Sequence, residues 1–202
     1  MIVTALEDYG KNRRKVYLDG QFAFILYKGE LSACHIKEQE ELSEEGYRQI
    51  IEEILWKRIR QRSLYLLMET DRTEQQLRLK LKGEFYPEEL IERNIEWLYG
   101  FHYLDDERYA ENYVRCHAGE KSRRQIYQEL LQKGVNREIA EQAAAGIETC
   151  EEEEQIKKLI EKKKVDLTTA SLKEKQKLYG YLMRKGFSSS EIMRVIKGIA
   201  EY

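Results

Sequence analysis

The stretch Ile126-Tyr-Gln-Glu-Leu130-Leu-Gln-Lys-Gly134-Val135 decides the fold, because it recurs 52 residues later as Leu178-Tyr-Gly-Tyr-Leu182-Met-Arg-Lys-Gly186-Phe187. A third copy lies 49 residues upstream, where Thr73-Glu-Gln-Gln-Leu77-Arg-Leu-Lys-Leu81 matches the segment that begins at Ser122. Each copy has apolar residues four positions apart, which is the spacing of one helix face. Self-similarity at this period is typical of helical repeat proteins.

Helical periodicity also flanks every copy. It predicts helices over residues 52–68, 105–117 and 150–164 before the copies, and over 87–98, 137–147 and 190–200 after them. The chain therefore contains three three-helix units. We place a small sheet in residues 1–42, a leading helix and the first unit in 43–103, the second unit in 104–148 and the third in 149–202.

Cap signals agree with these helices. Five Ser or Thr residues have a Glu or Gln three positions later, the spacing of a capping box: Thr73 with Gln76, Ser122 with Gln125, Thr149 with Glu152, Ser171 with Glu174, and Ser188 with Glu191. Pro87 suits the first position of a helix, and Gly134 and Gly186 suit left-handed helix ends.

The apolar stripe of each middle helix is too narrow to be buried alone. The stripes are Leu77 with Leu81, Ile126 with Leu130, and Leu178 with Leu182. We expect stacking of neighbouring units to bury them, which makes an elongated, curved solenoid.

The first 31 residues alternate with period two instead. Asp19-Gly20 separates two alternating runs, a strong signal for a hairpin with positive φ at both turn residues. With Ile2 to Leu6 as a third strand, the sequence predicts a small antiparallel sheet. Such a sheet serves either as a packing accessory or, through its exposed edges, as a docking surface.

Composition limits the class of protein. Of 202 residues, 36% are charged, against about 25% in average soluble domains, and the single Pro and 12 Gly leave few turns for an all-β fold. No apolar run is long enough to span a bilayer and the N-terminus lacks a signal-peptide pattern, so we expect a cytoplasmic protein. The scattered Cys34, Cys116 and Cys150 are interpreted as reduced packing residues.

Catalytic motifs are lacking: the sequence has no Gly-rich phosphate loop and no nucleophile elbow. His35, His102 and His117 are isolated, and Cys116-His117 lacks further metal ligands. Asp105-Asp106-Glu107 is compatible with a magnesium site, but acidic residues also stabilise a helix start, which we favour. Trp56, Trp97, Tyr109 and Tyr113 are interpreted as core rather than as stacking platforms. We expect no enzyme activity, no cofactor and no metal.

Charge segregation is the main functional signal. Residues 57–83 carry eight basic and three acidic side chains, whereas residues 84–111 carry two basic and nine acidic ones. If the first and middle helices share one side, their basic residues form a stripe that meets phosphates or an acidic protein surface. The candidate contact residues are Arg58, Arg60, Arg62, Arg72, Arg78, Lys80, Lys82, Lys121, Arg123, Arg124, Lys133, Lys157, Lys158, Arg184 and Lys185.

Three segments resemble the RecX regulators of the RecA recombinase. They begin at Arg72-Thr-Glu-Gln-Gln-Leu77, Gly100-Phe-His-Tyr-Leu-Asp-Asp-Glu-Arg-Tyr-Ala110 and Lys121-Ser-Arg-Arg-Gln-Ile126. The resemblance spans about residues 50–200, and the hairpin start is similar to the extension of Gram-positive members. It implies tandem three-helix repeats, no catalysis, a cytoplasmic location and binding in the groove of the RecA–DNA filament.

The resemblance further implies a negative regulator of recombinase and coprotease activity in DNA repair and the SOS response. We expect a monomer, with single- and double-stranded DNA as further partners. Only Arg72, Lys121, Arg123, Arg124 and Lys133 lie in the matching segments, and the third unit departs from the pattern with Lys173-Glu174-Lys175. The alternatives are a stand-alone DNA-binding module and a magnesium-dependent nucleic-acid hydrolase.

Overall fold

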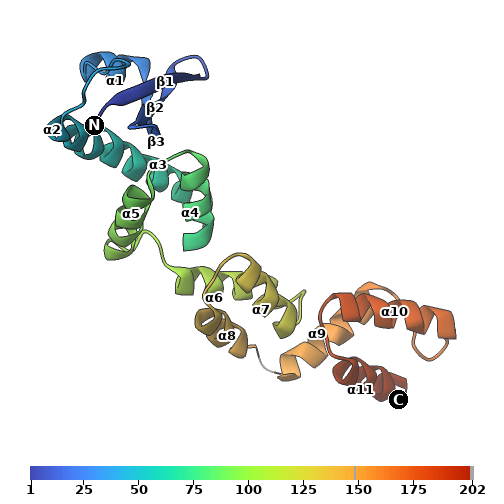
Figure 1. Ribbon diagram of the computed structural model, residues 1–202. Helices are drawn as coiled ribbons and strands as arrows, with labels where there is room; N and C mark the ends of the chain where they lie inside the picture. Colours follow the sequence, from blue (N-terminus) through green and yellow to red (C-terminus); the bar gives the residue numbers. More distant parts are fainter. Residues whose placement is uncertain (148, 201–202) are drawn as a thin grey trace. The chain divides into compact units, whose positions relative to one another are not determined.

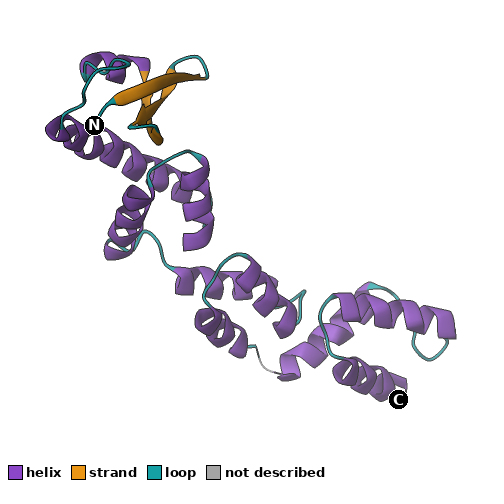
Figure 2. Cartoon of the chain, viewed as in Figure 1, coloured by secondary structure: helices purple, strands orange, loops and turns teal. Residues whose placement is uncertain are grey.

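A computed structural model describes residues 1–147 and 149–200, without the side chains of residues 149–151 and 200. The chain is mainly helical and begins with a three-stranded sheet, as the sequence predicts (Figures 1 and 2). It divides into two compact units, residues 1–105 and 106–202, which we call the N-terminal and C-terminal units.

The sheet has the strand order β1-β2-β3, with β1 at Val3–Tyr9, β2 at Arg13–Leu18 and β3 at Gln21–Tyr27, and both pairs are antiparallel. Asp19 and Gly20 join β2 to β3 with φ of 47° and 82°, which confirms the predicted turn. Val16, Phe24 and Leu26 are buried on one face. Ile25 is buried too, so the simple alternation of β3 is wrong; a loop of the first repeat covers part of the second face.

The outer edge of β1 is covered by the segment after it. The Val3 amide donates to Glu40 at 3.0 Å, the Gln39 amide donates to Val3 at 2.7 Å, and the Leu42 amide donates to Met1 at 2.8 Å. Helix α1, Lys28–Ala33, precedes this segment and was not predicted from the sequence. Coverage of the edge prevents strand pairing with another chain on that side.

The first repeat packs directly on the sheet. Helix α2 (Glu44–Gln49), a π-helical turn η1 (Ile50–Leu55) and α3 (Trp56–Glu69) follow one another without a break, and α4 (Glu74–Gly83) and α5 (Glu88–Gly100) complete the unit. Phe24 and Leu26 of the sheet share one core with Leu77 and Leu81 of α4. Pro87 is the N-cap of α5 rather than its first residue, because its backbone is extended at ψ 141°.

The C-terminal unit contains the second and third repeats. The second consists of α6 (Asp106–His117), α7 (Arg123–Gln132) and α8 (Arg137–Ala145), and the third of α9 (Thr149–Lys162), α10 (Leu172–Arg184) and α11 (Ser189–Ala200). Ile126 and Leu130 belong to one core cluster, and Leu178 and Leu182 to another. Burial by stacking of units is therefore wrong: the other two helices of the same repeat cover each stripe.

The second and third repeats meet at a seam of backbone contacts. The Ser122 amide donates to the Lys185 carbonyl at 3.2 Å, and the Arg123 amide donates to the Glu152 carboxylate at 2.6 Å. Gly186 lies opposite, with φ of 87°, and a Cβ there would stand 2.8 Å from Cβ of Gln125. Only glycine fits at this position, because both the backbone conformation and the space exclude a side chain.

Most of the predicted caps are observed. Thr73, Ser171 and Ser188 form reciprocal capping boxes, and Gly134 and Gly186 both have φ of 87°. Ser122 caps α7 by accepting from the Gln125 amide at 3.2 Å, but its own amide is used at the seam, so the reciprocal half of the box is not formed. The Thr149 side chain lies outside the described residues.

The cysteines differ in environment. Cys34 is half-buried against the N-terminal core, where burial raises the pKa of its thiol. Cys116 is exposed, so its interpretation as a packing residue is wrong; it lies on the solvent side of α6. The side chain of Cys150 lies outside the described residues.

Candidate partner and nucleic-acid interface

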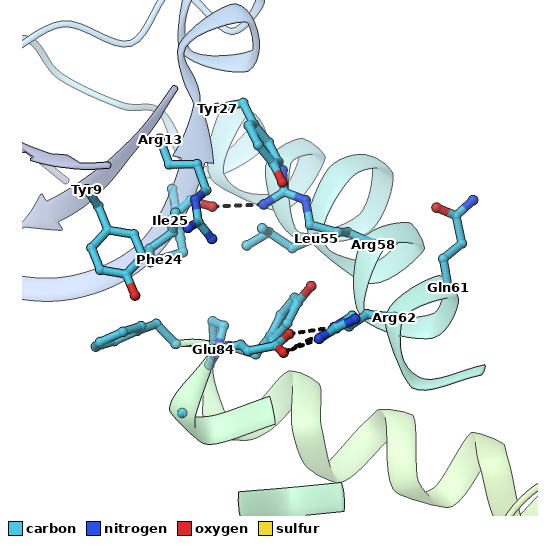
Figure 3. A pocket seen from close by; sticks show the side chains of 14 residues that line it. Tyr9, Arg13, Phe24, Ile25, Tyr27, Leu55, Arg58, Gln61, Arg62 and Glu84 are labelled. Carbon is cyan, nitrogen blue, oxygen red and sulfur yellow. Dashed lines mark hydrogen bonds and ion pairs between the residues drawn. The ribbon is translucent and has the colours of Figure 1, made fainter. Parts of the chain in front are cut away.

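Two predicted contact residues of α3 hold the N-terminal unit together. Arg58 donates to the Ile25 carbonyl at 3.0 Å, and Arg62 pairs with Glu84 through contacts of 2.6 to 3.1 Å (Figure 3). Arg58 also pairs with the Glu30 carboxylate. The hydrogen bonds to Glu84 raise the pKa of Arg62. These guanidinium groups link α3 to β3, α1 and the end of α4, and their charges are compensated within the fold.

Other arginines of this unit are also occupied. Arg78 contacts Glu74 at 2.5 Å and Glu92 at 2.8 Å, and Arg72 donates to the Leu66 carbonyl at 3.2 Å. The Arg60 guanidinium lies over the ring of Trp97, 4.6 Å from its centroid. Arg60 also lies 5.6 Å from the Trp56 ring centroid. Both tryptophan rings are half-buried and pack against the core of the N-terminal unit, as predicted, and they support the cation as well.

The exposed lysines of α4 are partly compensated. Lys80 lies 3.9 Å from Glu84, and Lys82 lies 3.0 Å from Glu88. Ion pairs of this exposure contribute little to stability and exchange readily with an external anion.

In the second repeat, Lys121 and Lys133 surround Tyr113. Lys121 pairs with Glu129 at 2.6 Å, and the ammonium groups of Lys121 and Lys133 lie 5.4 Å and 5.2 Å from the centroid of the Tyr113 ring. Burial opposes ionisation of Glu129, but hydrogen bonds from Lys121, Tyr113 and Gln125 lower its pKa overall. Tyr109 is buried in the core of the second repeat, and Tyr113 is half-buried against that core, as predicted.

Arg123 and Arg124 begin α7, are exposed, and border a groove of about 530 Å³ in the C-terminal unit. Arg137, at the start of α8, joins them there. Within the described part of the chain none of the three has a carboxylate at ion-pair distance. Arg137 was not predicted as a contact residue, although its position directly after the Asn136 cap placed it at a helix start.

The floor of this groove is acidic but protected. Glu152 is 7% exposed and accepts from the Arg123 amide, and Glu191 accepts from the Ser188 amide at 2.8 Å. Burial, together with the neighbouring Glu191, raises the pKa of Glu152. The exposed charges of the groove are therefore the three guanidinium groups and the Glu141 carboxylate, a net positive charge. Guanidinium groups bind carboxylates or phosphates in a bidentate manner.

The remaining candidates lie elsewhere in the third repeat. Lys157 and Lys158 are exposed on α9, Arg184 is exposed on α10, and Lys185 is half-buried next to the seam. Arg184 borders a different hollow, of about 450 Å³, with Lys163. The structure thus gathers Arg123, Arg124 and Arg137 around one groove, and none of the candidates of the third repeat lines it.

Among the described residues, no group of three or more His, Cys, Asp or Glu side chains is arranged to hold a metal ion. Asp106 begins α6 and is 7% exposed. No helix among the described residues is long and apolar enough to cross a membrane.

Models of two RecX domains match the chain. The second three-helix domain of RecX matches residues 105–143, and the third three-helix domain matches residues 151–196. The chain is 33% identical to the regulatory protein RecX of Caldanaerobacter subterraneus subsp. tengcongensis, over 97% of this chain and 98% of that protein. It is 32% identical to the regulatory protein RecX of Clostridium acetobutylicum, over 94% and 91%.

Solved structures give the same result. A crystal structure of a regulatory protein RecX superposes with a TM-score of 0.64 at 29% identity, and covers 96% of this chain and 98% of the other. RecX from Lactobacillus salivarius superposes with a TM-score of 0.62 at 25% identity, over 73% and 97%.

Proposed function

The chain belongs to the RecX family of regulatory proteins, and from this premise we propose that it is a negative regulator of the RecA recombinase. In this proposal it binds the RecA–DNA filament in the cytoplasm as a monomer, and restrains recombinase and coprotease activity during DNA repair and the SOS response. It acts by occupying a surface, without bond chemistry.

The observation that carries the proposal is the cluster of three exposed arginines at the groove of the C-terminal unit. Arg123, Arg124 and Arg137 extend from helix starts on two neighbouring helices, and within the described residues none of their guanidinium groups has a carboxylate at ion-pair distance. A filament of protein on DNA presents both acidic side chains and phosphates. Charge-assisted hydrogen bonds from several arginines to such a surface add up, because the chain holds them together.

The proposal is tested by RecA ATPase activity and filament length on single-stranded DNA with increasing amounts of the protein. We expect inhibition and shorter filaments. The triple variant Arg123→Gln, Arg124→Gln, Arg137→Gln should require a higher concentration, by about tenfold for each lost contact. Unchanged ATPase activity and filament length at every ratio of wild-type protein to RecA would rule the proposal out.

A matched control removes three charges away from the groove. Lys162, Lys173 and Lys197 are exposed and do not border it. Their joint replacement by Gln should leave inhibition close to that of the wild type. Equal loss in both triple variants would mean that net charge, not the groove, determines binding.

A stand-alone DNA-binding module is the second candidate, since the same arginines fit phosphates directly. The salt dependence of DNA binding distinguishes this candidate from the proposed RecA regulator. Affinity for free single-stranded DNA should then fall log-linearly with salt, with a slope of about −0.7 per phosphate contact. Strong filament binding with negligible affinity for free DNA at the groove would exclude this candidate.

The hydrolase alternative depends on Asp105 and Asp106. Joint replacement by Asn should abolish nuclease activity under that alternative. Under our proposal it should leave RecA inhibition unchanged and cost at most about 1 kcal/mol of stability, because the negative charges at the start of α6 are lost. Nuclease assays with magnesium on wild type and variant decide between them.

A further inference from the structure

The second face of the sheet, opposite the core, carries an aromatic and basic row. Tyr9 of β1 and Tyr27 of β3 are both register partners of Arg13 in β2. Residues directly opposite one another in an antiparallel sheet point to the same face. The row Tyr9, Arg13, Tyr27 therefore crosses all three strands, and the Arg13 guanidinium lies 4.8 Å from the Tyr9 ring centroid.

Lys15 extends the row by one step along β2. Its ammonium group lies 4.7 Å from the ring centroid of Phe85 and 5.4 Å from that of Tyr9. Neither Arg13 nor Lys15 has a carboxylate at ion-pair distance in the described part of the chain. Arg14 between them, which alternates to the other face, pairs with Asp8 at 3.1 Å. Arg13 and Lys15 are therefore cations of the row without an ion pair, and both lie beside aromatic rings. The paired Arg58 lies over the ring of Tyr27, 4.8 Å from its centroid.

A pocket of about 610 Å³ adjoins this row inside the N-terminal unit. Figure 3 shows Tyr9, Arg13 and Tyr27 on the sheet side of the opening, with Glu84 and Arg62 on the other. The wall between α4 and α5 is formed by Phe85 and Tyr86. Phe85 has a φ of 65°, rare for an aromatic residue, and this conformation brings its ring edge-on to Tyr9 at 5.4 Å.

Acidic groups at this face are already engaged. Glu84 is paired with Arg62, and Glu7 accepts a hydrogen bond from the Tyr17 hydroxyl at 2.8 Å. Burial raises the pKa of the Tyr86 phenol to about 12, so the pocket gains no negative charge from it at neutral pH. An anion that reaches Arg13 and Lys15 meets open positive charge beside apolar ring faces.

We propose that this sheet face and its pocket bind single-stranded polynucleotide, with an unpaired base against the rings of Tyr9 and Tyr27 and a flanking phosphate on Arg13 and Lys15. Aromatic faces together with a basic track are what single strands recognise, because every unpaired base offers a stacking face. A duplex hides those faces, so it is a poor ligand here. The site lies in the N-terminal unit and does not depend on the proposed contact with RecA.

The first experiment measures binding of the full chain to a fluorescein-labelled oligo-dT by anisotropy. The double variant Arg13→Gln, Lys15→Gln should weaken binding and reduce the salt slope by about 0.7, the value for the one phosphate contact that the two side chains share. Tyr27→Leu should weaken it by about five- to 150-fold through lost stacking, whereas Tyr27→Phe, which keeps the ring, should bind like wild type.

The matched control is Arg14→Gln, Lys28→Gln. It removes two charges from the same unit, and both side chains pair with Asp8 instead of bordering the row. Binding should change little. Equal losses in the two double variants would overturn the proposal, since net charge alone would then explain them. So would a duplex of the same length that binds as tightly as the single strand.

Location is tested by photocross-linking with an oligonucleotide that contains 5-bromodeoxyuridine, followed by peptide mapping. Cross-links should fall in peptides with Tyr9, Tyr27 or Tyr86. Cross-links confined to the C-terminal unit would overturn the proposal. Binding of an acidic peptide at this face, without any binding of oligo-dT, would overturn it too. RecA is absent from these assays, so their failure and the failure of RecA inhibition are separate results. An RNA oligomer of equal length shows whether the site distinguishes the sugar.

Discussion

In the N-terminal unit, Arg58, Arg62 and Arg78 each hold a carboxylate from a neighbouring helix or from their own, whereas Arg123 and Arg124 of the C-terminal unit extend from a helix start into solvent. Both sets come from segments with a similar fraction of Lys and Arg residues. A run of basic residues therefore does not by itself predict a binding surface, because the acidic residues that the fold places nearby decide whether each basic side chain is paired or accessible. In the N-terminal unit those acids come from α1, α4 and α5.

The comparison assigns separate roles. Paired arginines connect elements, and their loss should appear in stability. Open arginines contribute little to the fold, and their loss should appear in binding. The two tryptophans, Trp56 and Trp97, both lie in the N-terminal unit, so tryptophan fluorescence follows that unit alone while circular dichroism follows the whole chain.

The largest effect is expected at the seam that supports the groove. Gly186→Ala places a side chain in a left-handed conformation and against Gln125, which should cost about 3 kcal/mol of the stability of the C-terminal unit. Urea unfolding followed by circular dichroism should show an earlier transition, with the tryptophan transition unchanged. A shift of less than 1 kcal/mol would mean that the two repeats separate without cost, and that the groove is not preformed.

A direct test exchanges arginine for methionine in each unit. Arg62→Met removes the closest partner of Glu84 and leaves only Lys80, at 3.9 Å. It should destabilise the N-terminal unit by about 1–2 kcal/mol, measured by tryptophan fluorescence in urea. Arg124→Met should change stability by less than about 0.5 kcal/mol. Similar values for both variants would break the distinction between paired and open arginines.

The smallest effect concerns Glu152. Its pKa is raised in the folded protein, so its contribution to stability is fully present below the unfolded pKa and is lost as the pH rises through the folded value. Glu152→Gln keeps an oxygen that accepts from the Arg123 amide and removes the titration. The variant should match wild type in acid and be slightly more stable at neutral pH, by circular dichroism in urea. A variant less stable than wild type at neutral pH would contradict this.

Local patterns in the sequence predicted the elements well, because caps and turns depend on neighbours. Asp19-Gly20, the capping boxes at Thr73 and Ser171, and the glycine ends of α7 and α10 are all observed. The π-helical turn at Ile50–Leu55 and helix α1 were missed, since neither has a distinctive spacing. The elongated arrangement stays a prediction. A radius of gyration of about 16 Å by small-angle scattering, the value for a compact protein of this length, would contradict it.

The candidate site was predicted only in part, for a physical reason. Ion pairing depends on distant residues: Arg58 meets Glu30 and Arg78 meets Glu92, and no local pattern indicates either contact. Arg137 was overlooked because it stands alone in sequence and gains neighbours only through α7. The run Lys11 to Lys15 has four basic residues next to the aromatic end of a strand, which is a local indication of the basic sheet face. Which of these side chains lie on that face follows only from the strand register.

The separate cores of the repeats have a consequence for how the chain folds. Each repeat of the C-terminal unit buries its own apolar residues within about 50 residues of chain, so its contacts are short in sequence and should form quickly. The sheet instead needs Met1 to meet Leu42 and β3 to meet α3. We therefore expect amide hydrogens of the N-terminal unit to become protected last during refolding, and those of the second and third repeats to open independently of the N-terminal unit at equilibrium.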